Sequence, residues 1–150
     1  MRSLVAAAAL ALVVPTAVRS EEVATTKEAE LMVHQAVAYL HKEGKAKAFE
    51  VFDDPKGRFT YRDLYIMVYD LSGKCVAHGA KRERIGKVLL EHKDVDGKQF
   101  VKERVRIAKE HGKGWQEYKF QNPATGKVEQ KVAYLERAGD VIVVCGAYKK

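Results

Sequence analysis

The sequence has little of what cofactor-dependent, metal-binding or membrane-spanning proteins require. Its two cysteines, Cys75 and Cys145, form neither a CxxC redox pair nor a CxxCH haem-attachment motif. No apolar run reaches the roughly 20 residues that a spanning helix needs. A nucleophile elbow, an EF-hand loop and a spacing typical of metal ligands are also missing. We therefore expect no catalytic residues, no cofactor and no metal.

The overall composition is that of one folded domain. The 150 residues are 47% hydrophobic and 31% charged, so the chain can bury a core and stay soluble. A disordered protein has fewer apolar residues than this.

The first 20 residues predict a secretory signal peptide, which leaves residues 21–150 as a single domain. Arg2 supplies a positive start, residues 4–14 are apolar, and residues 18–20 offer a cleavage site. An uncleaved membrane anchor is the competing interpretation, but 11 apolar residues are short for one. The cut could also follow Ala17. We expect a periplasmic or secreted protein.

Cleavage also corrects the net charge. Removing Arg2 and Arg19 leaves 25 basic residues against 20 acidic ones, a net charge of +5. A basic surface can bind nucleic acid, but export argues against that, and the lysines are scattered along the chain. We expect no nucleic-acid partner.

The N-terminal part of the domain predicts helices. Apolar side chains recur about every 3.6 residues over residues 22–47, which indicates one long helix that Thr25 or Thr26 can cap. Gly44 frays or ends it. At 1.5 Å per residue the helix is about 38 Å long, so part of it extends beyond the core or pairs with another copy as a homodimer. Residues 46–60 predict a second, short helix and a turn.

Two strands are predicted next, over residues 64–69 and 74–78. The first is apolar on both faces, which is typical of a central strand. Strand alternation places Tyr65, Met67 and Tyr69 on one face.

The rest of the chain predicts a helix and three more strands. The helix covers residues 99–111, with its lysines and arginines facing outward, and Gly112 ends it. A hairpin follows over residues 115–134, and residues 140–148 form a final strand that is apolar almost throughout. The fold class is therefore α+β, with helices packed on a five-stranded antiparallel sheet.

The hairpin carries the clearest functional signal. Trp115, Tyr118 and Phe120 alternate with polar residues along its first strand, and Lys131 lies in the middle of the second. A lysine among aromatics, in a chain without a catalytic motif, indicates an anion-recognising pocket. The alternative is a solvent-exposed lysine on a core hairpin, as most strand lysines are. Spacing leaves both open.

Several stretches occur in the order found in a known family. They are DLYIMVYD, SGK, VAHG, IGK, DVDGKQF, GWQEYKFQNPATGKVEQK and a closing GAY. From about residue 26 to 148 the chain resembles a single Cache domain of the second type (sCache_2). Such domains are extracytoplasmic sensors of bacterial chemoreceptors and histidine kinases.

The resemblance implies a PAS-like Cache fold, with a long N-terminal helix packed on the five-stranded sheet, and a small-molecule pocket. The ligands of such domains are mostly small organic acids, so a carboxylate is the expected class. The implied lining residues are Tyr65, Met67, Tyr69, His78, Trp115, Tyr118, Phe120, Lys131 and Tyr134. Lys131 would pair with the carboxylate, and tyrosine and histidine would add hydrogen bonds. Gly79 and Phe120 depart from the proline and tryptophan of many relatives, so we expect a different loop geometry and a different pocket size.

The resemblance also bears on architecture and on the cysteines. A receptor would continue into a membrane helix and an output module, whereas this chain stops at Lys150, so we expect a free-standing Cache protein that serves a membrane receptor, kinase or transporter. The PAS-like strand order places Cys75 and Cys145 two strands apart, about 9.6 Å. That exceeds the roughly 7 Å Cα limit for a disulfide, so we expect two free, buried thiols.

Two other functions compete with ligand binding. The first is a protein-interaction or regulatory subunit with a vestigial pocket, which an exposed apolar stripe on the long helix would favour. The second is an enzyme that uses His78 or His111 with Asp94, but no catalytic motif supports it.

Overall fold

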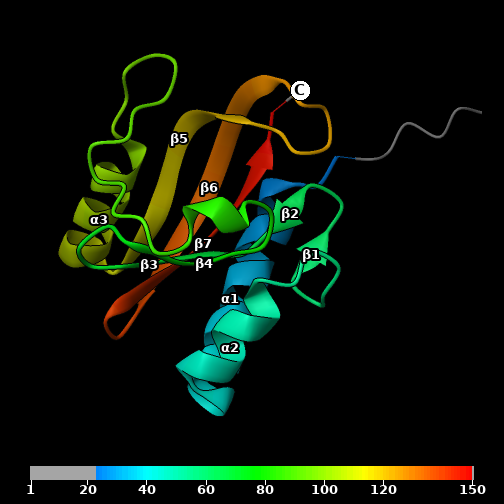
Figure 1. The fold of residues 1–150 in the computed structure, drawn as a ribbon, viewed down its shortest axis with the longest axis vertical. Coiled ribbons are helices and arrows are strands. Elements are labelled where there is room, and N and C mark those ends of the chain that lie inside the picture. Colours follow the sequence, from blue (N-terminus) through cyan, green and yellow to red (C-terminus); the bar gives the residue numbers. More distant parts are fainter. Residues whose placement is uncertain (1–22, 150) are drawn as a thin grey trace, which may run out of the picture.

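A computed structural model describes residues 23–149 (Figure 1). The predicted signal peptide, residues 1–20, lies outside the described residues. The main sheet contains β3 (Met67–Asp70), β4 (Cys75–His78), β5 (Lys113–Gln121), β6 (Val128–Ala138) and β7 (Val141–Tyr148). Its order is β4-β3-β7-β6-β5, and every pairing is antiparallel. The predicted α+β class and five-stranded sheet are confirmed.

The predicted long N-terminal helix is α1 (Thr26–Glu43), and the predicted second, short helix is α2 (Lys45–Phe52). Thr25 caps α1, because its hydroxyl accepts the Glu28 N–H at 3.1 Å while the Glu28 carboxylate accepts the Thr25 N–H at 2.7 Å. Gly44, with φ at 80°, separates the helices. Gly44 therefore ends the first helix, as predicted, but the range 22–47 was too long: α1 has 18 residues, about 27 Å.

The predicted strand over residues 64–69 is divided between two sheets. β2 (Leu64–Tyr65) pairs with β1 (Thr60–Tyr61) in a small separate hairpin, and β3 joins the main sheet. The predicted alternation of side chains between the two faces continues across this break. Leu64 packs in the α1-side core, whereas Tyr65 and Tyr69 pack in the core on the opposite face.

The segment between β4 and β5 contains η1 (Arg82–Arg84), a 3-10 turn, and α3 (Phe100–His111). Gly112 ends α3 in the left-handed conformation, as predicted.

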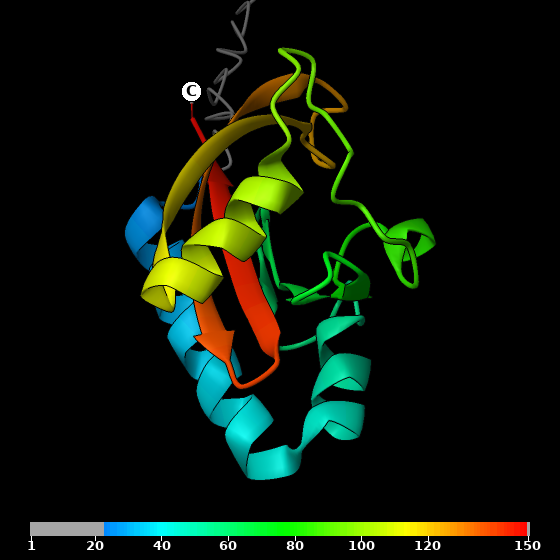
Figure 2. The ribbon, with the colours of Figure 1, turned by 90° about the vertical axis from the view of Figure 1, so that its left-hand side faces the viewer.

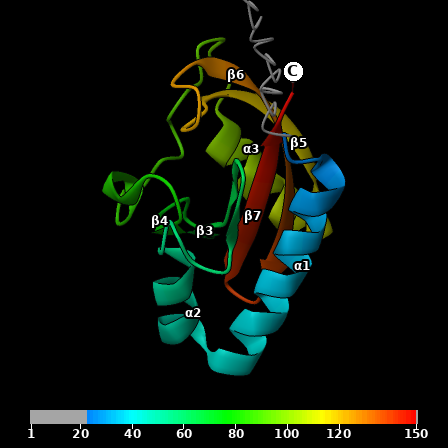
Figure 3. The same cartoon turned by 90° about the vertical axis from the view of Figure 1, so that its right-hand side faces the viewer.

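The helices α1 and α3 lie on opposite faces of the main sheet (Figures 2 and 3). α1 packs against β6 and β7, while α3 packs against β5 and β6. Two apolar cores result, one on each face. Among residues 23–149, no helix has the length and apolar character needed to cross a bilayer.

The strand order separates the two cysteines. Cys75 lies on β4 and Cys145 on β7, with β3 between them. Both thiols are free and buried, so the prediction of two unpaired cysteines is confirmed.

Candidate functional site

Lys131 lies in the middle of β6 and points into the core between the sheet and α3. It stands opposite Tyr118 of β5 and Tyr148 of β7. Its side chain has 0% exposure, so the solvent-exposed alternative is wrong. The Nζ atom donates a hydrogen bond to the Tyr65 hydroxyl at 2.8 Å and lies 4.2 Å and 4.8 Å from the ring centres of Tyr65 and Tyr148.

Gly146 makes room for the stem of Lys131. A Cβ at position 146 would come within 2.7 Å of Lys131 Cε and 3.0 Å of the Ala133 Cβ. The absence of a side chain on β7 therefore leaves a channel in which the lysine runs across the sheet. This close approach of the lysine to Gly146 positions the ammonium group.

Lys131 is buried without a counter-ion. Its hydrogen-bond partner is a neutral phenol, and no carboxylate of the described chain forms an ion pair with it. Burial lowers the pKa of Lys131, but the Tyr118 and Tyr65 oxygens outweigh that effect and raise it above its usual value. The ammonium group therefore keeps its charge at neutral pH.

His78 lies at the end of β4, beside Tyr65. The two rings pack with their centres 5.2 Å apart. His78 Nδ1 accepts the backbone N–H groups of Ala80 and Lys81 at 3.2 Å and 2.9 Å, so the ring proton is assigned to Nε2. Burial, and then the charge of Lys131, lowers the pKa of His78 to about 2. The ring is neutral and offers a buried Nε2–H donor that has no partner.

Arg104 projects from α3 into the same core and is fully buried. Its Nε donates to Gln116 Oε1 at 2.8 Å, whereas its two terminal nitrogens have no hydrogen-bond acceptor. The guanidinium carbon lies 4.7 Å and 5.4 Å from the ring centres of Tyr69 and Tyr118. The prediction that the arginines of this helix face outward is wrong at Arg104.

A third cation reaches the site from the segment that follows β4. Arg84 of η1 is half-buried, and its guanidinium carbon lies 5.2 Å from the ring centre of Phe120. Its Nε and one terminal nitrogen are buried without an acceptor. Lys131 Nζ lies 5.6 Å from the centre of the same ring, so the Phe120 ring contacts both cations.

Seven of the nine predicted residues meet around this interior. They are Tyr65, Met67, Tyr69, His78, Tyr118, Phe120 and Lys131. Trp115 and Tyr134 do not join them. They pair with each other across β5 and β6, with ring centres 5.1 Å apart, and Tyr134 packs in the α1-side core. Residues 115 and 118 are an odd number apart on one strand, so their side chains point to opposite faces.

Four residues of the site were missed. They are Arg84, Arg104, Gln116 and Tyr148. A signal for Arg104 was present, because it lies four residues from both Phe100 and Ala108, on the buried stripe of α3. Gln116 is two residues before Tyr118 and shares its face. No local pattern marks Arg84, which the loop brings to the site.

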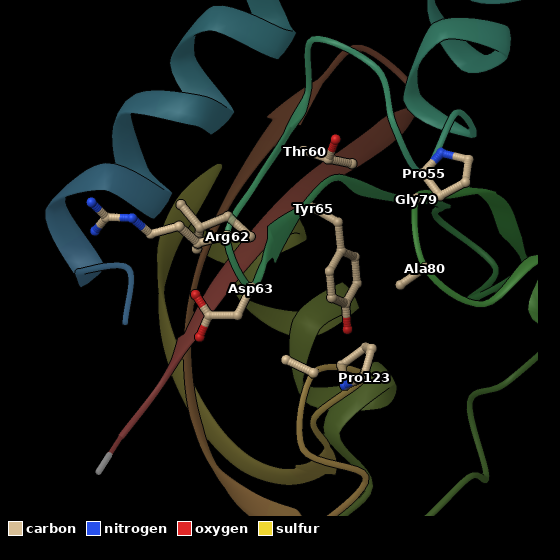
Figure 4. A pocket seen from close by; sticks show the side chains of 10 residues that line it. Pro55, Thr60, Arg62, Asp63, Tyr65, Gly79, Ala80 and Pro123 are labelled. Atoms are coloured by element: carbon tan, nitrogen blue, oxygen red, sulfur yellow. The ribbon is translucent and has the colours of Figure 1, made fainter. Parts of the chain in front are cut away.

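A pocket opens beside Tyr65. It has a volume of about 320 Å³ and lies between the β1–β2 hairpin, the residues that follow β4, and the β5–β6 turn. Figure 4 shows the Tyr65 side chain extending from β2 with its hydroxyl toward Pro123 of that turn, and Ala80 also lines the pocket. Because the same hydroxyl accepts from Lys131, Tyr65 separates this pocket from the buried cations.

Asp94 and His111, which the enzyme hypothesis invoked, lie in a turn and at an exposed helix end. Within residues 23–149, no group of three His, Cys, Asp or Glu side chains is placed to hold a metal ion. Asp94 accepts the backbone N–H groups of Asp96, Lys98 and Lys119, which closes a turn against β5. His111 lies exposed at the end of α3 and contacts Glu110.

The five-stranded antiparallel sheet with helices on both faces is a PAS-like fold. The chain belongs to the family described as Single Cache domain 2, whose sequence profile matches residues 6–150.

Individual relatives are similar to this chain in sequence or in fold. The chain is 34% identical over 74 residues to the sensor histidine kinase MctS of Rhizobium johnstonii, a match that covers 49% of this chain and 16% of the kinase. A methyl-accepting chemotaxis protein from Vibrio parahaemolyticus superposes with a TM-score of 0.70 at 23% identity, over 81% of this chain and 86% of that one. A Cache chemosensory domain studied for carboxylic acid recognition superposes with a TM-score of 0.71 at 19% identity, over 83% and 93%.

Proposed function

We propose that this protein is an extracytoplasmic sensor-type domain that binds a small carboxylate at Lys131, Arg104 and His78. The observation that carries the proposal is the set of five buried nitrogen atoms on His78, Arg84 and Arg104 that have no acceptor. Buried polar groups are almost always hydrogen-bonded, because leaving them unpaired costs free energy. Several unpaired hydrogen-bond donors in one interior therefore favour an anionic ligand.

The chemistry of these donors suits a carboxylate. A guanidinium forms two parallel hydrogen bonds with a carboxylate, and an ammonium or imidazole N–H adds a charge-assisted or neutral bond. The rings of Tyr65, Tyr69, Tyr118 and Phe120 surround the donors and exclude water, which strengthens polar contacts. The carboxylic acid recognition studied in a structural neighbour supports the same class.

The location and partners of the protein belong to the same proposal. We infer that residues 1–20 direct export and that the domain works in the periplasm or outside the cell. Its relatives are sensor domains of kinases and chemoreceptors, so a membrane receptor, kinase or transporter is the expected protein partner. Mass spectrometry of the exported protein tests the cleavage site.

The competing interaction module depended on an exposed apolar stripe along the N-terminal helix. Throughout α1, every residue of which is described, Leu31 is the one large apolar side chain that is exposed. A single exposed leucine is ordinary. The outer face of α1 therefore favours ligand binding as the main function, and a homodimer through α1 remains a separate proposal for size measurement in solution.

A thermal-shift screen tests the proposed function. The exported protein is measured with small carboxylates, and with amines and neutral alcohols of matched size as controls. A ligand at 100 times its dissociation constant adds about 2.7 kcal/mol to the free energy of unfolding, which is about 8 to 12 °C for a domain of this size. A hit confined to carboxylates supports the proposal. Equal shifts from all classes, or none, would reject it and favour the interaction module.

A further inference from the structure

The interior holds more positive charge than one carboxylate can neutralise. Lys131 and Arg104 are both fully buried, and neither has a carboxylate partner in the described part of the chain. Buried charges are normally paired, since removing an ion from water is costly. A monoanion at either residue would leave the other unpaired.

The two cations lie at different positions along the sheet. Lys131 contacts Tyr65 and Arg104 contacts Tyr69. Those tyrosines are four residues apart on nearly continuous strands, which corresponds to about 13 Å between their Cα atoms. The site thus has two ends: a Lys131 end, where His78 packs beside Tyr65, and an Arg104 end, where Gln116 accepts a hydrogen bond from Arg104.

Tyr118 lies between the two ends. It is directly opposite Lys131 in the β5–β6 register, and its ring centre is 5.4 Å from the guanidinium carbon of Arg104. Its ring also stacks on Phe100 of α3, with centres 4.5 Å apart. An anion that satisfied both ends would therefore pass over the Tyr118 ring edge and would need an apolar middle and two charged groups.

We propose that the ligand is a dicarboxylate, with one carboxylate held by Lys131 and the His78 Nε2–H and the other by the two free nitrogens of Arg104. This inference rests on the proposed function and specifies its ligand. Arg84, half-buried beside Phe120, supplies a third cation from the loop side. Inorganic phosphate or sulfate carries a similar charge on one compact centre, so it satisfies one end and leaves the other unpaired.

The test is calorimetry with a matched ligand series on the exported protein. The probes are propionate, butyrate and valerate, then malonate, succinate and glutarate, and finally inorganic phosphate. Each dicarboxylate is compared with the monocarboxylate of equal carbon number. We expect at least one dicarboxylate to bind 30-fold or more tightly than the monocarboxylate of equal carbon number, and more tightly than phosphate.

Variants of Arg104 identify the second end. Arg104→Gln should lower the ratio of dicarboxylate to monocarboxylate affinity at least tenfold. Arg104→Lys keeps the positive charge but cannot donate two parallel hydrogen bonds, so it should lower this affinity ratio less. The lysine variant replaces the glutamine variant in the test if the latter does not fold. Arg106→Gln is the matched control, because Arg106 is on the same helix, exposed, and pairs with Glu110 at 2.8 Å. Its ratio should equal that of the wild type.

The outcomes separate this inference from the proposed function. Monocarboxylates that bind as tightly as dicarboxylates would overturn the inference and leave the carboxylate site standing. Phosphate that binds more tightly than every dicarboxylate would also overturn it. A wild-type ratio in Arg104→Gln would remove Arg104 from the site. If no anion binds, both the inference and the proposed function fall.

Discussion

Replacing Lys131 with methionine should stabilise the empty protein and weaken ligand binding. The substitution removes the charge but keeps most of the length and volume of the side chain. Burying an ammonium costs several kcal/mol. In return, the Tyr65 hydrogen bond contributes about 1 kcal/mol, and the rings of Tyr65 and Tyr148 contribute about 2 kcal/mol.

The Tyr118 and Tyr65 oxygens raise the Lys131 pKa chiefly once they are ionised. With neutral phenols, the balance predicts that Lys131→Met raises the free energy of unfolding by about 1–3 kcal/mol. At about 4 °C per kcal/mol for a domain of this size, Tm rises by about 4–12 °C. Binding should change in the opposite direction, because losing a buried charge contact costs about 2 kcal/mol or more. The dissociation constant for the carboxylate then increases about 30-fold or more.

Urea unfolding measures the first effect and calorimetry the second. Lys119→Met is the matched control, since Lys119 is on β5 and forms a surface ion pair with Asp96 at 2.9 Å. Its stability should change by less than about 0.5 kcal/mol, with no loss of affinity. A Lys131→Met protein that is less stable than the wild type, or that binds with unchanged affinity, would refute the reasoning.

Three further predictions concern groups around this lysine and the two thiols. Gly146→Ala should weaken carboxylate binding while circular dichroism stays native, because the new Cβ displaces the flexible Lys131 stem; unchanged affinity in calorimetry would contradict this. Burial raises the pKa of Tyr118, but the Lys131 and Arg104 charges outweigh it and hold that pKa below its usual value. Its phenolate then competes with the ligand for both cations, so affinity measured against pH should fall as Tyr118 deprotonates, and Tyr118→Phe should abolish that fall. Burial raises the pKa of Cys75 to about 11 and of Cys145 to about 12, so a thiol reagent at pH 8 should label neither in the native protein and both in denaturant without reductant; one or no thiol after unfolding would contradict the free state.

The sheet could be predicted because its signals are local. Apolar runs, turn residues and strand alternation define β3, β4 and β7, and the same alternation placed Tyr65, Met67 and Tyr69 together. Alternation also places the Trp115 side chain on the opposite face of the strand from Tyr118. Counting residues along the strand would therefore have assigned Trp115 to the α1 side and excluded it from the site. The division of residues 64–69 between two sheets depends on the β1 pairing, which no local pattern in the sequence specifies.

The site was harder to predict because its main cations break the usual rule for charged residues. An arginine within an amphipathic helix is normally solvated, and only its position between Phe100 and Ala108 indicates that Arg104 is buried. Lys131 was suggested by its aromatic neighbours, although spacing alone could not distinguish an interior from a surface position. Arg84 depends on the path of a loop, so it could be found only in three dimensions.

The arrangement of the two buried cations has a mechanical consequence. Arg104 belongs to α3 and Lys131 to β6, so two buried like charges are carried by a helix and by the sheet against which it packs. Repulsion between these two charges opposes the packing of α3 on the sheet. A dianion bound between Lys131 and Arg104 would neutralise this repulsion and allow α3 to pack closer to the sheet. Occupancy would then be converted into a change in helix–sheet spacing, which a neighbouring molecule could read without touching the ligand.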